Sequence, residues 1–316
     1  MTYSQGNLIV DDDYNIFATG NAAGTGDDGV ANINSVLGAG STDKGYGQST
    51  TVPAVSAGAT VQATSWANLL ARNVTLGAHQ GTTLTSITSP SAGDTVAAFA
   101  ALSTNVTATY NSRNNAAASG SDASVTSTST SSWNNSSVLT KTFTFPSAAQ
   151  LRYFFNAGGM IRQSWSRSGG TASTQNTEWS NLLTACGTVV LTGAATSKTI
   201  AGTALTGLTK VGGSGSATMN LTEGAYALDG TPAINFTQVP GAPYGSNKVE
   251  LSYSISGNVI TIKSDLSDDY APPDPGSPDN VDGTLSCVST IRFPSTANLS
   301  DTWGTPSQNS PSWVQS

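Results

Sequence analysis

The stretch FPSAAQLRYFFNAGGMIRQSW, residues 145–165, carries the most specific local folding signals in this sequence. Pro146 has no backbone N–H to continue a strand ladder, so the alternating run before it must end there. Ser147 stands three residues before Gln150, which is the spacing of a capping box and predicts a helix that begins directly after Ser147. Residues 156–159 (NAGG) tolerate left-handed backbone, so the helix should end there.

The residues on either side extend this pattern. Residues 141–145 (KTFTF) alternate as a strand does, and residues 160–167 predict another strand that ends at Gly169-Gly170. A second helix is predicted to end at Gly187, because four residues before it are spaced for one helical face: Trp179, Leu182, Leu183 and Cys186. Thr188–Leu191 again resembles a strand, so the region alternates strand–helix–strand–helix–strand.

The first 115 residues predict short helices separated by glycine-rich loops. Apolar spacing together with capping and stopping residues indicates helices over residues 11–18, from Asp28 to Gly38, from Ser65 to Gly77, and from Asp94 toward Tyr110. Helices of this length are marginal alone in water, so they must pack against other parts of the chain.

The rest of the chain favours strands. Residues 116–137 contain almost only Ala, Ser, Thr, Asn and Gly, which predicts a Ser/Thr/Ala-rich loop or an exposed strand at the boundary between a helical region, 1–115, and a β-rich α+β domain, 138–303. Residues 249–262 alternate around a central turn, as a hairpin does. The tail, 304–316, is expected to be extended or held by a neighbouring subunit. The predicted fold class is α+β and β-rich, with β-sandwich-like antiparallel strands toward the C-terminus.

The composition limits the possible partners. Charged residues make up 10% of the chain, against about 25% in an average soluble domain, and Ser, Thr, Asn, Gly and Ala take their place. A net charge of −7 argues against nucleic acid as a partner. No run approaches the ~18 apolar residues of a membrane span, and the first six residues lack the features of a secretion signal. We therefore expect synthesis in a cytoplasm and no membrane insertion.

Few residues suggest chemistry. Cys186 and Cys287 lie in apolar patterns and are interpreted as small core residues rather than a disulfide. His79 is the single histidine, and its neighbours in sequence favour a hydrogen-bonded loop residue over a metal ligand or a member of a Ser/His/Asp site. These observations predict a protein that is not an enzyme and has no cofactor.

Six aspartates form an acidic segment within residues 265–282, interrupted by four prolines. They are Asp265, Asp268, Asp269, Asp274, Asp279 and Asp282. Such oxygen-rich segments can bind calcium, but the Gly and the distal Glu of an EF-hand loop are missing, so a solvated surface loop is favoured. Paired carboxylates for glycoside cleavage are a further alternative, although no acid and base stand out.

Four of the twelve basic residues lie in the central region: Lys141, Arg152, Arg162 and Arg167. In a chain with so few charges this concentration is informative. The arginines are candidates for an interface with an adjoining subunit, because Arg is favoured at interfaces. The alternative, equally supported, is that they form the wet faces of a helix and a strand.

Three segments resemble structural proteins of tailed bacteriophages, including those that infect cyanobacteria and other aquatic hosts. The segments are Gly45-Tyr46-Gly47-Gln48, the helix from Ser65-Trp66 to His79-Gln80-Gly81-Thr82, and Leu151 to Arg162. The similarity covers roughly residues 1–190. It implies a location in the virion, in the tail, baseplate or fibre, with copies of the same chain and other virion proteins as partners. It assigns no functional residues.

These observations lead to one main hypothesis and two rivals. The main hypothesis is a virion subunit that acts by symmetric assembly, with glycine-rich loops and extended termini joining its copies. A receptor- or glycan-binding adhesin at a fibre tip is the alternative, in which exposed Trp and Tyr contact host surface glycan. A glycan depolymerase is a third reading.

Overall fold

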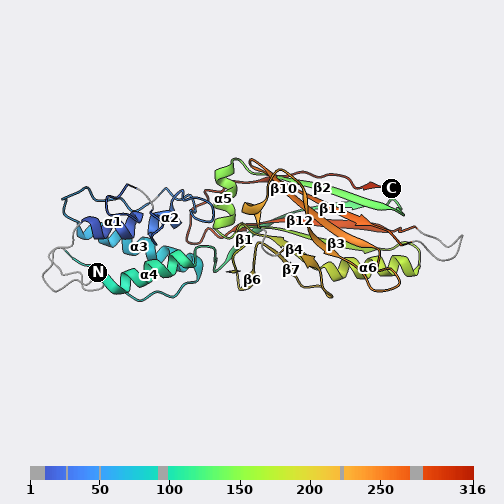
Figure 1. Cartoon of the computed structure of the whole chain (residues 1–316), viewed down its shortest axis with the longest axis horizontal. Helices are drawn as coiled ribbons and strands as arrows, with labels where there is room; N and C mark the ends of the chain where they lie inside the picture. Colours follow the sequence, from blue (N-terminus) through green and yellow to red (C-terminus); the bar gives the residue numbers. More distant parts are fainter. Residues whose placement is uncertain (1–10, 26–27, 50, 92–98, 221–223, 271–279) are drawn as a thin grey trace.

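Short helices at one end and two antiparallel sheets at the other give the molecule an elongated shape (Figure 1). The computed structural model describes residues 11–25, 28–49, 51–91, 99–220, 224–270 and 280–316. The predicted fold class is confirmed, since the chain is mixed α+β and rich in antiparallel strands. None of the helices described combines the length and apolar character that crossing a bilayer requires.

The helical end packs four helices through aromatic and aliphatic side chains. They are α1 (Asp11–Thr19), α2 (Ile33–Leu37), α3 (Ala63–Gln80) and α4 (Phe99–Asn111). The ring of Tyr14 meets Trp66 edge-on at a centroid distance of 5.4 Å, and Phe17 meets Phe99 at 4.8 Å. These contacts join α1 to α3 and to α4, as the short helices require.

Two predicted helix ends are wrong. Helix α2 is capped by Asn32, whose side chain accepts a hydrogen bond from the Ser35 N–H at 2.7 Å. The helix therefore begins at Ile33 and not directly after Asp28. Helix α3 continues through Gly77 and ends at Gly81, which has a φ of +71°. A Cβ on Gly77 would lie 2.7 Å from Leu84, so this glycine permits close packing rather than a stop. The predicted start at Asp94 lies outside the described residues.

The five-stranded sheet contains a strand in the segment for which the sequence predicted either a loop or an exposed strand. Its order is β1 (Ser119–Ser129), β12 (Thr284–Pro294), β3 (Met160–Ser168), β4 (Thr188–Leu191) and β7 (Leu208–Val211). Within residues 116–137 the exposed-strand interpretation therefore holds over Ser119–Ser129, half of the segment, and the loop interpretation is wrong there. Ser and Thr suit an edge strand with one wet face, and β1 pairs along its length with β12.

The seven-stranded sheet contains the predicted hairpin. Its order is β13 (Ser307–Gln308), β2 (Ser136–Thr144), β11 (Val259–Ser267), β10 (Lys248–Ser256), β9 (Ala233–Gln238) and β8 (Thr218–Met219), and β14 (Val314–Gln315) also pairs with β2. Strands β10 and β11 pair from Ser256↔Val259 outward, across a turn at Gly257 with φ +60°. The hairpin is confirmed.

The central strand–helix–strand–helix–strand unit is confirmed, but it is divided between the sheets. Helix α5 (Ala148–Asn156) leads from β2 in one sheet to β3 in the other, and its capping box forms as predicted, with the Ser147 side chain accepting the Gln150 N–H. Trp165 of β3 donates its indole N–H to Ser264 of β11 at 3.3 Å, which shows that the two sheets face each other.

The two sides of this sandwich are closed differently. Helix α6 (Thr174–Cys186) contacts β3 of one sheet and β9 and β10 of the other. On the opposite side the tail lies along β2, and its side chains donate to β1: Gln308 to the Ala123 carbonyl and Trp313 to the Ser127 carbonyl. The tail is extended, as predicted, and its own chain holds it.

A hairpin and a short helix complete the fold. Strands β5 (Lys198–Ile200) and β6 (Thr203–Leu205) form a two-stranded sheet, and η1 (Ala225–Ala227) is a 3₁₀ turn. The hairpin covers the outer face of the five-stranded sheet and buries a small second core. That core consists of Ala116, Met160, Val190, Ile200 and Leu205.

Candidate functional site: the junction between the helical end and the sheets

The segment Gly45–Gln48 lies where the helical end meets the sheets and contacts both, and its glycines explain how closely it packs. Gly45 and Gly47 have φ values of +93° and +71°, a backbone conformation that other residues adopt at a cost. A Cβ on Gly47 would lie 2.4 Å from the ring of Tyr153. Helix α5 therefore packs directly against this backbone.

Tyr46 anchors the segment in the interior. Its side chain is fully buried, its hydroxyl donates to the Arg113 carbonyl at 2.7 Å, and the same oxygen accepts from Gln80 at 3.0 Å. Burial raises the pKa of Tyr46, so the hydroxyl stays protonated and keeps both bonds.

Asn156, the last residue of α5, binds the segment from the other side. Its amide nitrogen donates to the carbonyls of Lys44 at 2.8 Å and Gly45 at 3.1 Å. The Tyr226 hydroxyl lies 2.9 Å from both the Asn156 side-chain oxygen and the Arg152 carbonyl. These buried polar bonds fix the orientation of α5 relative to the helical end.

Arg152, at this junction, binds groups of its own chain. The Arg152 guanidinium donates to the Ala39 carbonyl at 2.8 Å and lies over the ring of Tyr153 at 5.2 Å. Arg152 thus joins α5 to the loop after α2.

The other two arginines lie elsewhere. Arg162 is on the outer face of the five-stranded sheet, 3.5 Å from Asp122, which Arg292 also binds. Arg167 is almost covered, and its guanidinium lies 3.2 Å from Asp282. The structure therefore does not bring Arg152, Arg162 and Arg167 together in one patch, and their role at an interface stays a prediction.

Asp282 is held by several donors besides Arg167. Burial alone would raise the pKa of Asp282, but hydrogen bonds from Thr171 and Asn176 and the charge of Arg167 outweigh it, so the pKa is lowered. The ionised carboxylate connects the start of α6 to the strand ends beside it.

The described members of the acidic segment have separate partners. Asp265 lies 2.7 Å from Lys263, and Asp268 accepts from Gln175 at 2.6 Å. Asp274 and Asp279 lie outside the described residues. Among the residues that the structure does describe, no three His, Cys, Asp or Glu side chains are grouped so as to hold a metal ion.

His79 is not the loop residue that the sequence predicts, because it lies in the last turn of α3. Its ring is buried and meets Tyr46 edge-on at 5.0 Å. Burial lowers the pKa of His79 to about 4, against a smaller opposing effect of a backbone hydrogen bond with Ala157.

The predicted core cysteines are confirmed as free and buried, and burial raises the pKa of Cys186 to about 12 and that of Cys287 to about 11.

The sequence did not predict that two lysines, Lys141 and Lys198, are buried. Lys141 is fully buried on the inward face of β2, not on a wet face, and donates to the Asn309 carbonyl of the tail at 3.1 Å. Lys198 donates to Thr192 at 3.1 Å, and burial lowers its pKa to about 8. The alternation of KTFTF carried the signal for Lys141, since its position shares the inward face with Phe143.

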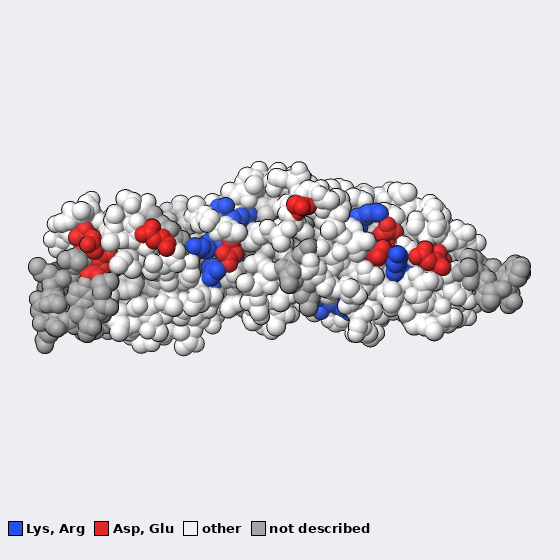
Figure 2. Space-filling view, viewed as in Figure 1, with Lys and Arg blue, Asp and Glu red and all other residues white. Residues whose placement is uncertain are grey.

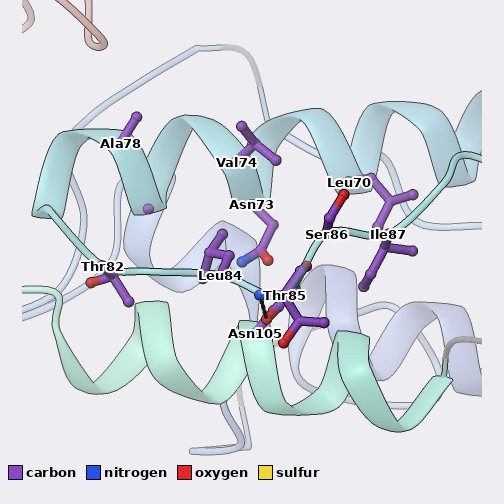
Figure 3. Close-up of a pocket in the computed structure, with 11 residues that line it drawn as sticks. Leu70, Asn73, Val74, Ala78, Thr82, Leu84, Thr85, Ser86, Ile87 and Asn105 are labelled. Atoms are coloured by element: carbon purple, nitrogen blue, oxygen red, sulfur yellow. Dashed lines mark hydrogen bonds between the residues drawn. The ribbon is translucent and has the colours of Figure 1, made fainter.

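A groove of about 320 Å³ opens in the helical end, between α3 and the segment that follows it (Figure 3). Asn105 of α4 holds that segment through two hydrogen bonds to the backbone of Thr85: its side-chain oxygen accepts from the Thr85 N–H at 2.9 Å, and its amide nitrogen donates to the Thr85 carbonyl at 2.8 Å. The walls are largely apolar, with Leu70, Val74, Ala78, Leu84 and Ile87 among the lining side chains, and none of the 11 lining residues is charged.

Charged groups are sparse on the surface. Figure 2 shows a face on which uncharged side chains cover most of the area and blue and red groups lie next to each other in a few places. No protein-family model, no curated protein and no solved structure matches the chain.

Proposed function

We propose that this chain is a structural subunit of a bacteriophage particle, in the tail, baseplate or fibre, and that it acts by assembling with copies of itself and with other virion proteins. The observation that carries the proposal is the junction. Buried polar bonds through Tyr46 and Asn156 hold an elongated molecule's two ends in one fixed orientation. A subunit that contacts neighbours at both of its ends in a symmetric particle needs a fixed orientation between those ends.

Two further features support an assembly role. Side chains with strongly shifted pKa values, such as those of Tyr46, His79 and Lys198, are buried and hydrogen-bonded within the fold. Two of the segments that resemble phage structural proteins also meet at the junction, where Gly47 packs against the Tyr153 ring and Asn156 donates to the Gly45 carbonyl.

The test is to locate the protein in particles. Purified virions from a host that expresses the chain are analysed by mass spectrometry and by electron cryomicroscopy, with the host lysate as the comparison. We expect the chain at a fixed copy number and a density that fits the elongated shape. Its absence from purified particles would contradict the proposal. Light scattering of the purified chain then measures whether it assembles alone.

A second candidate function is a glycan-binding adhesin, although all six Trp side chains are buried, so the predicted contact of exposed Trp with glycan is wrong. The observation that favours it is a pocket with two arginines on the outer face of the five-stranded sheet. A subunit at a fibre tip would present such a face to host envelope. Binding of the purified chain to a glycan array, compared with binding to host cells stripped of surface polysaccharide, tests this function separately from particle location.

A further inference from the structure

The outer face of the five-stranded sheet carries a pocket of about 190 Å³ beneath the β5–β6 hairpin. Strand residues form its floor and hairpin residues its roof. They are Ser119, Met160, Arg162, Thr188, Val190, Val211 and Arg292 below, and Ile200, Ala201, Thr203 and Leu205 above. Backbone bonds tether the hairpin, from Ala116 N to the Thr199 carbonyl at 3.0 Å and from Ala201 N to the Ala116 carbonyl at 2.8 Å.

The charges of this pocket do not balance. Arg292 binds Asp122 in a bidentate pair, with Nε–Oδ1 at 2.6 Å and Nη2–Oδ2 at 2.7 Å. Arg162 reaches the same carboxylate through one nitrogen at 3.5 Å. Two guanidinium groups therefore share one carboxylate, and one positive charge remains beyond what Asp122 neutralises. Asp122 is occupied by Arg292, so Arg162 keeps most of its donors for another anion.

The electrostatics of Arg162 agree with this geometry. Burial lowers the pKa of Arg162, repulsion from Arg292 lowers it further, and Asp122 offsets these effects in part. An anion placed beside Arg162 would relieve both the repulsion and the loss of hydration.

The walls add two other kinds of contact. Met160, Val190, Ile200 and Leu205 are buried apolar side chains that line the pocket. Ser119 also lines it, and the Ser119 hydroxyl is buried without a hydrogen-bond partner among the described residues. A polar group in that position is normally paired in a folded protein, so it indicates a missing partner.

We propose that this pocket binds the carboxylate of an acidic sugar residue, a uronic acid, with Arg162 as the principal contact. A single remaining positive charge matches a singly charged carboxylate. Pockets for drug-sized ligands measure ~300–1,000 Å³, so a pocket of about 190 Å³ suits one ring. The apolar side chains in the lining suit the C–H face of such a ring, and Ser119 and Thr188, which also line the pocket, carry hydroxyls that can pair with sugar hydroxyls. The inference stands independently of a location in the virion.

The ligand test uses the full chain at low salt and measures binding by isothermal titration calorimetry. The probes are D-galacturonate and D-glucuronate, with D-glucose as the neutral ring and acetate as the carboxylate without a ring. We expect at least one uronate to bind ten-fold or more tightly than both glucose and acetate. Binding no tighter than glucose overturns the carboxylate contact, and binding no tighter than acetate overturns the sugar-sized site. If neither uronate binds, the proposal is wrong.

Two substitutions of opposite sign test the residues. Arg162→Gln should weaken uronate binding ten-fold or more, because it removes the free donors. Asp122→Asn should strengthen binding several-fold, because it removes the competing carboxylate while both arginines stay. Arg72→Gln, at the helical end, is the matched control and should bind as the wild type does. Equal affinities in all four proteins would overturn the assignment, and the gain expected for Asp122→Asn is a readout that misfolding does not imitate.

Discussion

Gln48 and Ser300, 252 residues apart in the sequence, bind each other reciprocally: the Gln48 amide nitrogen donates to the Ser300 carbonyl at 2.9 Å, and the Ser300 N–H donates to the Gln48 side-chain oxygen at 2.9 Å. The Thr302 hydroxyl adds a bond of 2.6 Å to the Tyr46 carbonyl. The helical end is thus fastened both to α5 and to the segment that follows β12, so the junction is held at two separate points of the β part.

Replacing Gln48 by Ala should lower the free energy of unfolding by about 1–3 kcal/mol, because it removes the reciprocal pair with Ser300, at ~0.5–1.5 kcal/mol for each bond, together with two longer bonds to Tyr46 and Thr302. Urea denaturation of both proteins measures the difference. Gln62→Ala is the control, since the Gln62 side chain is exposed and reaches a neighbouring carbonyl at 3.4 Å. Equal losses in the two variants would mean that the Gln48 bonds contribute nothing specific.

Two glycines with nearly the same backbone separate strain from packing at the junction. Gly47 and Gly58 have φ values of +71° and +74°, but a Cβ would meet the Tyr153 ring at 2.4 Å in the first case and nothing within 4 Å in the second. Gly58→Ala should cost about 1 kcal/mol from left-handed strain. Gly47→Ala should cost at least ~2 kcal/mol more, because α5 must shift. Thermal unfolding measures both, and similar costs would show that α5 yields without penalty.

Local signals in the sequence predicted much of the fold. The Ser147 cap, the stops at Gly158 and Gly187, and the hairpin around Gly257 depend on contacts between residues near in sequence, so they form as expected. Gly77 shows where this reasoning fails. A glycine that permits close packing on Leu84 looks the same in sequence as one that ends a helix.

Long-range pairing could not be predicted. Nothing in the local pattern assigns β2 to one sheet and β3 to the other, because the β2–α5–β3 connection fits either arrangement. The pocket partners of Arg162 were missed for the same reason. Asp122 and Arg292 each stand as the single charge in a strand of neutral residues, and this isolation is the signal that could have drawn attention to them.

The buried His79 should make stability depend on pH. Its pKa is 6.5 in the unfolded chain and about 4 in the folded protein, so the unfolded state binds more protons between these values and stability falls as the pH falls through this window. The loss attributable to His79 should reach about 2 kcal/mol between pH 7.5 and pH 5. His79→Gln removes this contribution and leaves the carboxylates as they are. Urea denaturation of both proteins at the two pH values measures it, and parallel pH profiles would contradict the assignment.

The two cysteines should be inert in the folded protein. Both thiols are buried and their pKa values are raised, so the reactive thiolate is rare at neutral pH. Ellman's reagent should detect no fast-reacting thiol in the native chain and two after denaturation. A fast native reaction would show that α6 or β12 opens readily, and separate Cys186→Ala and Cys287→Ala variants would identify which one does.

We expect Trp313 to anchor the tail along the edge of the sandwich. Its side chain is buried against the core and its indole N–H donates to the Ser127 carbonyl of β1 at 3.2 Å, while the neighbouring Val314 is 71% exposed. Trp313→Ala should therefore lower the free energy of unfolding by about 3 kcal/mol. Val314→Ala should change it by less than ~0.5 kcal/mol. Hydrogen exchange gives the local readout, because detachment of the tail uncovers the edge of β2 and should speed exchange across residues 305–316 before the rest of the sandwich unfolds. Unchanged exchange in Trp313→Ala would mean that the short β13 and β14 pairings hold the tail without its anchor.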